Sequence, residues 1–115
     1  MIDIYYGDMK PKNQCTDAEL SIEFLTKTAH VLRLLAHPCR LKIIEVLERG
    51  RSMPVYAIVR QLGLSQAATS QHLNQMRRVG LVRSVRHGRE VRYEIADATS
   101  LTILGCIRKK SRRAS

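Results

Sequence analysis

The sequence predicts a mainly α-helical domain with one small β-hairpin. Three observations lead to this fold class: apolar residues recur at helical spacing through most of residues 17–79, Pro and Gly stand at the expected helix ends, and strand-like alternation begins only after Gly80. With 115 residues, the chain is long enough for one domain and too short for two hydrophobic cores.

The first helix is expected over residues 17–35, "DAELSIEFLTKTAHVLRLL". Thr16 is a suitable N-cap, with Glu19 at the spacing of a capping box. Because its apolar residues fall on two flanks, this helix needs two neighbours, and one of them is expected to be a second subunit. Residues 1–16 show no sustained periodicity and are expected to form a flexible N-terminal arm. The flanks hold Phe24, Val31 and Leu35, and Leu25 and Leu32.

Two shorter helices are expected next. The second begins at Pro38, which fits a first helical turn, and runs to about Arg49 before Gly50 ends it. The third covers Val55–Leu62, and Pro54 marks its start. The residues of these helices expected to face the core are Leu41, Ile44, Leu47, Ile58 and Leu62.

The fourth helix is expected over Gln66–Val79, with Gly80 closing it. In the preceding turn "GLS", Gly63 is suited to a positive φ, Leu64 to the core, and Ser65 to capping the helix. Helix, three-residue turn and helix form the helix-turn-helix layout.

The stretch "LVRSVRHGREVRYEI" alternates apolar and basic residues, which predicts two strands with Gly88 at the bend. Asp97 is expected to cap a last helix over residues 97–110, so the folded domain spans residues 17–110. Residues 111–115 complete a basic C-terminal tail. One flank of the last helix carries Leu101, Leu104 and Ile107.

The excess positive charge lies in one half of the chain. Residues 1–50 hold seven basic and seven acidic side chains, whereas residues 51–115 hold thirteen and three, which accounts for the whole net charge of +10. A generic solubilising surface usually mixes the two signs. The segregation therefore favours a face that binds nucleic acid.

The fourth helix has two contrasting sides at 100° per residue. Thr69, Leu73 and Met76 form the expected buried stripe, and His72 lies beside it as a packed, hydrogen-bonded side chain. The opposite side is short and amide-rich and ends in a cation. An ordinary solvated helix face would favour Glu and Lys, but this helix has no acidic residue, so we expect it to read DNA. The DNA-facing residues are Ala67, Ser70, Gln71, Asn74 and Arg78.

The hairpin bend carries Arg86, His87 and Arg89 around Gly88. A basic, flexible tip of this kind is suited to a minor groove or to flanking phosphates. The alternative is a charged hairpin that only prevents edge-to-edge aggregation, a role that Lys and Glu fill equally well.

Two stretches, "LRLLAHPCRLKIIEVL" and "LSQAATSQHLNQMRRVGLVRSVRHGREVRYEI", closely resemble the ArsR-type (ArsR/SmtB) winged-helix repressors. The family pattern has a helix with L-a-x-P-x-R-l-x-I-l-x-x-L, a recognition helix with S-q-x-x-x-S-x-H-L, and then G-L-V and a basic wing. The match covers about residues 25–108.

The resemblance implies a winged helix-turn-helix homodimer formed through helices 17–35 and 97–110. Such a dimer binds a roughly palindromic operator in double-stranded DNA and represses transcription until it senses an inducer. Gln66, Ser70 and Gln71 stand where the family contacts DNA, and residues 86–89 occupy the wing.

The inducer is not evident from the sequence. Pro54 and Tyr56 replace the thiols of the family's arsenic- and lead-sensing site, and Thr99 replaces a histidine of its zinc- and nickel-sensing site. No other cluster of metal ligands is evident from the spacing. A metal ion or a redox inducer at the thiols stays open, and so does the alternative that the thiols are only small apolar side chains. The three thiols are Cys15, Cys39 and Cys106.

An enzyme using Cys39 with His37 or His30 is disfavoured, because the sequence has no phosphate loop, nucleophile elbow or paired carboxylates. A nonspecific DNA-binding or protein-interaction module with the same fold remains the alternative.

The chain has neither an apolar run long enough for a membrane span nor a signal-peptide layout, so a cytoplasmic protein is expected. One Phe and no Trp leave a small core that a homodimer would enlarge.

Overall fold

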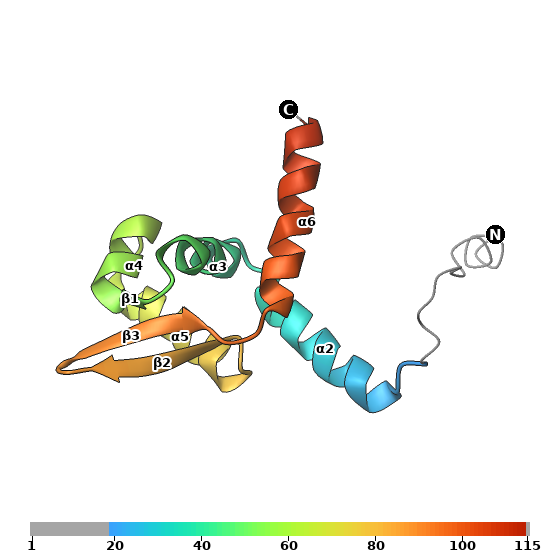
Figure 1. Cartoon of the computed structure of the whole chain (residues 1–115), viewed down its shortest axis with the longest axis horizontal. Coiled ribbons are helices and arrows are strands. Elements are labelled where there is room, and N and C mark those ends of the chain that lie inside the picture. The colour runs from blue at the N-terminus through green and yellow to red at the C-terminus, as the bar shows by residue number, and fades with distance from the viewer. Residues whose placement is uncertain (1–18, 115) are drawn as a thin grey trace.

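The computed structural model describes residues 19–114, and Figure 1 shows their arrangement. The elements are α2 (Ile22–Leu35), α3 (Pro38–Gly50), β1 (Met53–Pro54), α4 (Val55–Leu62), α5 (Gln66–Arg78), β2 (Val82–His87), β3 (Glu90–Ile95) and α6 (Thr99–Ala114). The mainly α-helical class with a β-hairpin is confirmed. The expected arm of residues 1–16, with Thr16 next to it, lies outside the described residues.

Helix α2 begins later than its periodicity predicts. Ser21 is the N-cap, and its hydroxyl accepts the backbone N–H of Phe24 at 3.1 Å, so residues 19–21 are not helical. The expected start at residue 17 was wrong at these positions, because a Ser hydroxyl at the cap takes up a free N–H of the first turn. Leu35 is the only buried residue of α2.

Helix α3 lies at the centre and contacts α2, α4, α5 and α6. Ile44, Leu47 and Ile58 are buried as predicted, but Ile43 is also fully buried, because α3 is covered on more than one side. Leu41, Leu62 and Leu64 are only half-buried at the edge of the core. The other members of the core cluster are Leu35, Leu73, Met76, Leu81, Val82 and Leu104.

The end of α3 differs by one residue from the prediction. Gly50 is the last helical residue, and Arg51 takes the positive φ of 67° as the C-cap. A Cβ at Gly50 would overlap the side chain of Met53, which packs against the core. A larger residue at position 50 would therefore require the Met53 side chain to shift.

The sheet has three antiparallel strands in the order β1-β3-β2. The predicted hairpin pairs Val82 with Ile95 and His87 with Glu90. The short strand β1 was not predicted; it pairs Met53 with Tyr93 at the edge of the sheet. Pro54, expected only as a helix start, ends β1 and is also the N-cap of α4, as an edge strand permits.

Helices α2 and α6 project from the body formed by α3, α4, α5 and the hairpin (Figure 1). Asp97 caps the start of α6, since its Oδ1 accepts the N–H of Thr99 at 2.9 Å. Residues 111–114, expected as a basic tail, continue this helix. Arg108 of α6 donates to Glu48 of α3 at 2.7 Å and holds α6 against the body. Among residues 19–114, no helix is long and apolar enough to cross a membrane.

Candidate nucleic-acid interface

Helices α4 and α5 and the turn between them form a helix-turn-helix unit. Gly63 adopts a φ of 73°, and its N–H bonds to the carbonyl of Val59 at 2.9 Å, which ends α4. Ser65 is the predicted N-cap of α5, since its hydroxyl accepts the N–H of Ala68 at 3.1 Å. The hydroxyl of Thr69 donates back to the Ser65 carbonyl at 2.9 Å. These local bonds fix the direction in which α5 leaves the turn.

The buried side of α5 is the stripe that the sequence predicts. Thr69, Leu73 and Met76 are all 0% exposed, and Leu73 and Met76 belong to the core cluster. Val79 and His72 flank the stripe and are half-buried. Because the stripe is fully buried, the rotation of α5 about its own axis is fixed.

The opposite side of α5 is open to solvent. Gln71, Asn74 and Arg78 are exposed, and Ser70 is the one predicted DNA-facing residue that is half-buried. No acidic residue occurs in α5. We call the exposed set the α5 face; its members are Gln66, Ala67, Gln71, Asn74 and Arg78.

Two arginines end α5. Arg78 belongs to the α5 face, and Arg77, which the helical pattern does not predict to face DNA, is also exposed. Neither forms a salt bridge within residues 19–114. A cation near a helix C-terminus is favoured by the helix dipole, and both are free to bind an anionic partner.

Some charged side chains of the hairpin form salt bridges, and the basic side chains at its tip form none within residues 19–114. Near its base, Arg83 bonds to Glu94 at 3.1 Å, and in β3 Arg92 bonds to Glu90 at 3.2 Å. At the tip, the exposed residues carry no salt bridge to any described acidic group. Gly88 makes the bend with a φ of 65°. The exposed tip residues are Arg86, His87 and Arg89.

His72 is a packed, hydrogen-bonded side chain, as predicted. Its Nδ1 accepts a hydrogen bond from Nε of Arg40 at 3.1 Å, and its ring meets that of His37 edge to face. Burial lowers the pKa of His72 below its usual 6.5, and electrostatic interactions with His37 and Arg40 lower it further. The neutral imidazole is therefore the favoured form.

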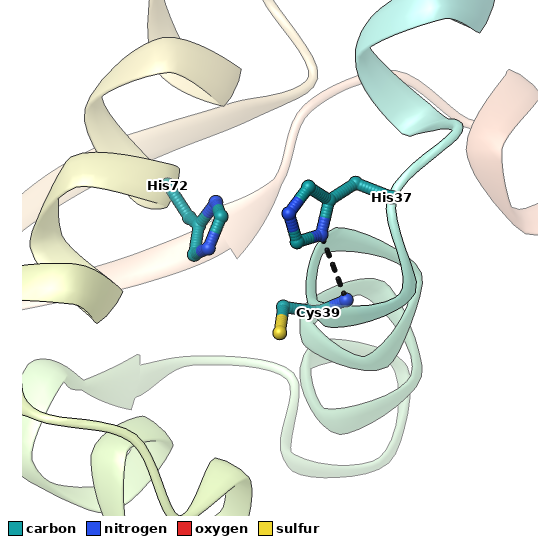
Figure 2. A group of neighbouring side chains, drawn as sticks. All are labelled: His37, Cys39 and His72. Carbon is teal, nitrogen blue, oxygen red and sulfur yellow. Dashed lines mark hydrogen bonds between the residues drawn. The ribbon is translucent and has the colours of Figure 1, made fainter.

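The thiols lie in different settings. Cys39 is half-buried at the start of α3 and Cys106 is exposed on α6; both are free, and Cys15 lies outside the described residues. The sequence spacing indicates no cluster of metal ligands, but the structure brings His37 and His72 to Cys39 (Figure 2). His72 is far from the other two residues in the sequence. The only local signal of a metal site is therefore the pair His37 and Cys39, which stand in "HPC" at a helix start.

Residues 37–84, which run from the start of α3 through the helix-turn-helix into β2, match the family described as "Bacterial regulatory protein, arsR family". The nodulation protein NolR of Rhizobium meliloti is 34% identical over 97 residues, which cover 84% of this chain and 73% of NolR. The transcriptional repressor PagR of Bacillus anthracis is 38% identical over 79 residues, 69% of this chain and 79% of PagR.

Two solved structures show the same fold. The crystal structure of Bacillus anthracis PagR has a TM-score of 0.71 at 32% identity and covers 76% of this chain and 99% of PagR. The solution structure of a homodimeric winged helix-turn-helix DNA-binding domain, Mb0332 of Mycobacterium bovis, has a TM-score of 0.71 at 24% identity. It covers 86% of this chain and 93% of that domain.

Proposed function

Because the chain belongs to the ArsR family of bacterial regulatory proteins, we propose that it represses transcription as a homodimer that inserts α5 into successive major grooves of an operator. The chain is a winged helix-turn-helix transcriptional regulator.

The proposed DNA binding rests on the α5 face. Its small residue Ala67 lets the helix backbone approach a groove floor, and the amides of Gln71 and Asn74 match the donor and acceptor pattern of adenine. The α5 face is exposed, whereas the stripe on the other side of the helix is fully buried. No element among residues 19–114 therefore covers this face. The α5 face begins at Gln66 and ends at Arg78, and we include the half-buried Ser70 among the proposed DNA contacts.

The hairpin tip is proposed to bind the backbone beside the groove. Arg86, His87 and Arg89 lie at the tip of the hairpin, and neither arginine forms an ion pair within residues 19–114. Contacts of this kind position a protein and carry little sequence information.

The homodimer is proposed to form through α2 and α6. Helix α2 exposes large apolar side chains that a monomer would leave in water: Phe24 is 54% exposed and Ile22 is 69% exposed. Ile107 of α6 is 42% exposed. A groove of about 760 Å³ beside α2, lined in part by Phe24 and Val31, would receive part of the partner. The Mycobacterium bovis domain, which has the same fold, is a homodimer.

The alternative is a nonspecific DNA-binding or protein-interaction module. The experiment that separates the two selects bound fragments from the host genome and then measures affinity for a selected fragment and for random DNA at rising salt. A specific repressor keeps a large preference for the selected fragment, whereas a nonspecific binder loses both affinities alike. Failure to enrich any sequence would contradict the proposed function.

We propose no enzymatic activity, because the matching family is one of regulatory proteins and PagR is a transcriptional repressor. Since a bacterial regulator must reach the chromosome, we place its action in the cytoplasm. The operator sequence and the regulated genes would come from the same fragment selection.

A further inference from the structure

Three metal-binding side chains meet where the start of α3 contacts the middle of α5 (Figure 2). His37 is the N-cap of α3, Cys39 lies in the first turn of α3, and His72 comes from α5. One ligand atom of each, a ring nitrogen or Sγ, lies within 4.8 Å of the other two. All three side chains are half-buried, and the ring centroids of the two histidines are 4.6 Å apart.

We propose that His37, Cys39 and His72 form a binding site for one Zn²⁺ ion. Imidazole nitrogens and a thiolate are donors that zinc prefers, and three protein ligands leave a fourth position for water. Around a tetrahedral zinc, neighbouring donor atoms lie about 3.3–3.6 Å apart, so small side-chain rotations complete the site. The thiol proton passes to solvent when Sγ binds the ion, and both histidines bind as neutral imidazoles.

Zinc competes with two hydrogen bonds that hold the histidines. Nδ1 of His37 accepts the backbone N–H of Cys39, and Nδ1 of His72 accepts Nε–H of Arg40, each at 3.1 Å. A neutral imidazole has one unprotonated nitrogen, so Nε2 carries the proton in both rings. An ion at Nδ1 displaces the donor, and an ion at Nε2 requires the proton to move to Nδ1, which then cannot accept. Zinc binding therefore breaks both bonds.

Arg40 links this site to the rest of the fold. Besides His72, its guanidinium bonds to the carbonyl of Leu34 in α2 at 3.1 Å and to the side chain of Gln75 in α5. Zinc at His72 removes the Nε contact and places a second positive charge beside Arg40, so the guanidinium must move. The way in which α5 is held against α2 and α3 changes with zinc occupancy.

The site is tested with the full-length, tag-free, reduced protein and Co²⁺ as a spectroscopic substitute for zinc. We expect one Co²⁺ per protomer, with intense visible bands of tetrahedral coordination and a thiolate-to-cobalt charge-transfer band. Added Zn²⁺ should abolish both signals by displacing cobalt. Absence of the charge-transfer band at one equivalent of Co²⁺ would overturn the proposal.

The variants assign the ligands. Cys39→Ser should remove the charge-transfer band, and His72→Gln should weaken Co²⁺ binding by about tenfold or more. Cys106→Ser is the matched control and should leave the spectrum unchanged, because Cys106 is exposed on α6 and is not a member of the cluster. A band that survives in Cys39→Ser and disappears in Cys106→Ser would refute the site. Circular dichroism of each variant separates lost binding from lost folding.

A third variant tests the competition directly. Arg40→Ala removes both the competing hydrogen bond and the neighbouring positive charge, so we expect it to bind Co²⁺ several-fold more tightly than the wild type. If Arg40 only supports the fold, its loss would leave the Co²⁺ affinity unchanged or lower it. Either result would contradict competition between the metal and the hydrogen bond from Arg40 to His72.

The effect on DNA rests on the proposed function of α5, whereas the site itself does not. Operator affinity measured with Zn²⁺ and with a chelator should differ several-fold for the wild type and agree within twofold for Cys39→Ser. Equal affinities in the wild type would overturn the coupling. The cobalt spectrum still reports the site if no operator is found, so the two failures are distinguishable.

Discussion

Nε of Arg40 in α3 donates a hydrogen bond to Nδ1 of His72 in α5, across 3.1 Å and 32 positions of sequence. The same guanidinium reaches Gln75 of α5 and the carbonyl of Leu34 in α2. One side chain thus joins three helices beside the proposed DNA-reading element. Its geometry, a planar fork with several donors, is one that lysine cannot supply.

Arg40→Ala should destabilise the fold by about 1–3 kcal/mol, because it removes charge-assisted hydrogen bonds and leaves their acceptors partly unpaired. Urea unfolding followed by circular dichroism measures the change. Arg60→Ala is the matched control: Arg60 is exposed on α4, and its removal should cost less than about 0.5 kcal/mol. Equal losses in the two variants would contradict the structural role of Arg40.

Gln71→Ala and Arg89→Ala should affect DNA binding differently. Gln71 lies on the α5 face, so its loss should cost about 1–3 kcal/mol on the operator and little on random DNA. Arg89 lies at the hairpin tip, so its loss should weaken binding to both DNAs and reduce the salt slope by about 1. Fluorescence anisotropy at several salt concentrations compares them. If both variants lose operator and random binding in equal proportion, the two roles are assigned wrongly.

Phe24→Asp should turn the dimer into a monomer, because it places a charge on the exposed apolar side of α2. Size-exclusion chromatography with light scattering measures the mass, and operator affinity should fall with it. Gln61→Asp adds the same charge at an exposed position of α4 and should remain dimeric. If Phe24→Asp remained dimeric, this side of α2 would not form the dimer interface.

Stability should fall as the pH drops through the titration of His72. Its pKa is lowered in the folded protein, chiefly by burial, so below pH 6.5 the unfolded chain binds a proton that the folded chain resists. The stabilisation is complete above pH 6.5 and is lost as the pH falls through the lower, folded pKa. Urea unfolding across this range should show a smaller pH slope for His72→Gln than for the wild type. His30→Gln, at an exposed position of α2, should keep the wild-type slope.

The helix-turn-helix and the hairpin could be predicted closely because their signals are local. Gly63 and Ser65 define the turn through their own backbone and hydroxyl, and the bounds of α4 were predicted to the residue. The stripe on α5 follows from a period of 3.6 residues, which depends on no distant contact. For the same reason, the α5 face was correctly separated from the core, except for the half-buried Ser70.

Other features needed the tertiary structure. Ile43 is buried because α3 is surrounded, and Met53 pairs with Tyr93 because the hairpin folds back onto the chain before α4. Two-residue strands have no periodicity to detect. The first turn of α2 was misplaced because Ser21 and Thr16 are both good caps, and the sequence alone does not rank them.

The sequence by itself determined which segments are helical, which side of α5 is buried, and where positive charge gathers, because each depends on neighbours within about one turn of helix or one hairpin. Only the tertiary structure decided that His72 lies beside His37 and Cys39 and accepts a hydrogen bond from Arg40. Contacts between residues more than thirty positions apart depend on how whole helices pack, and that packing is settled by the core as a unit rather than by any local pattern.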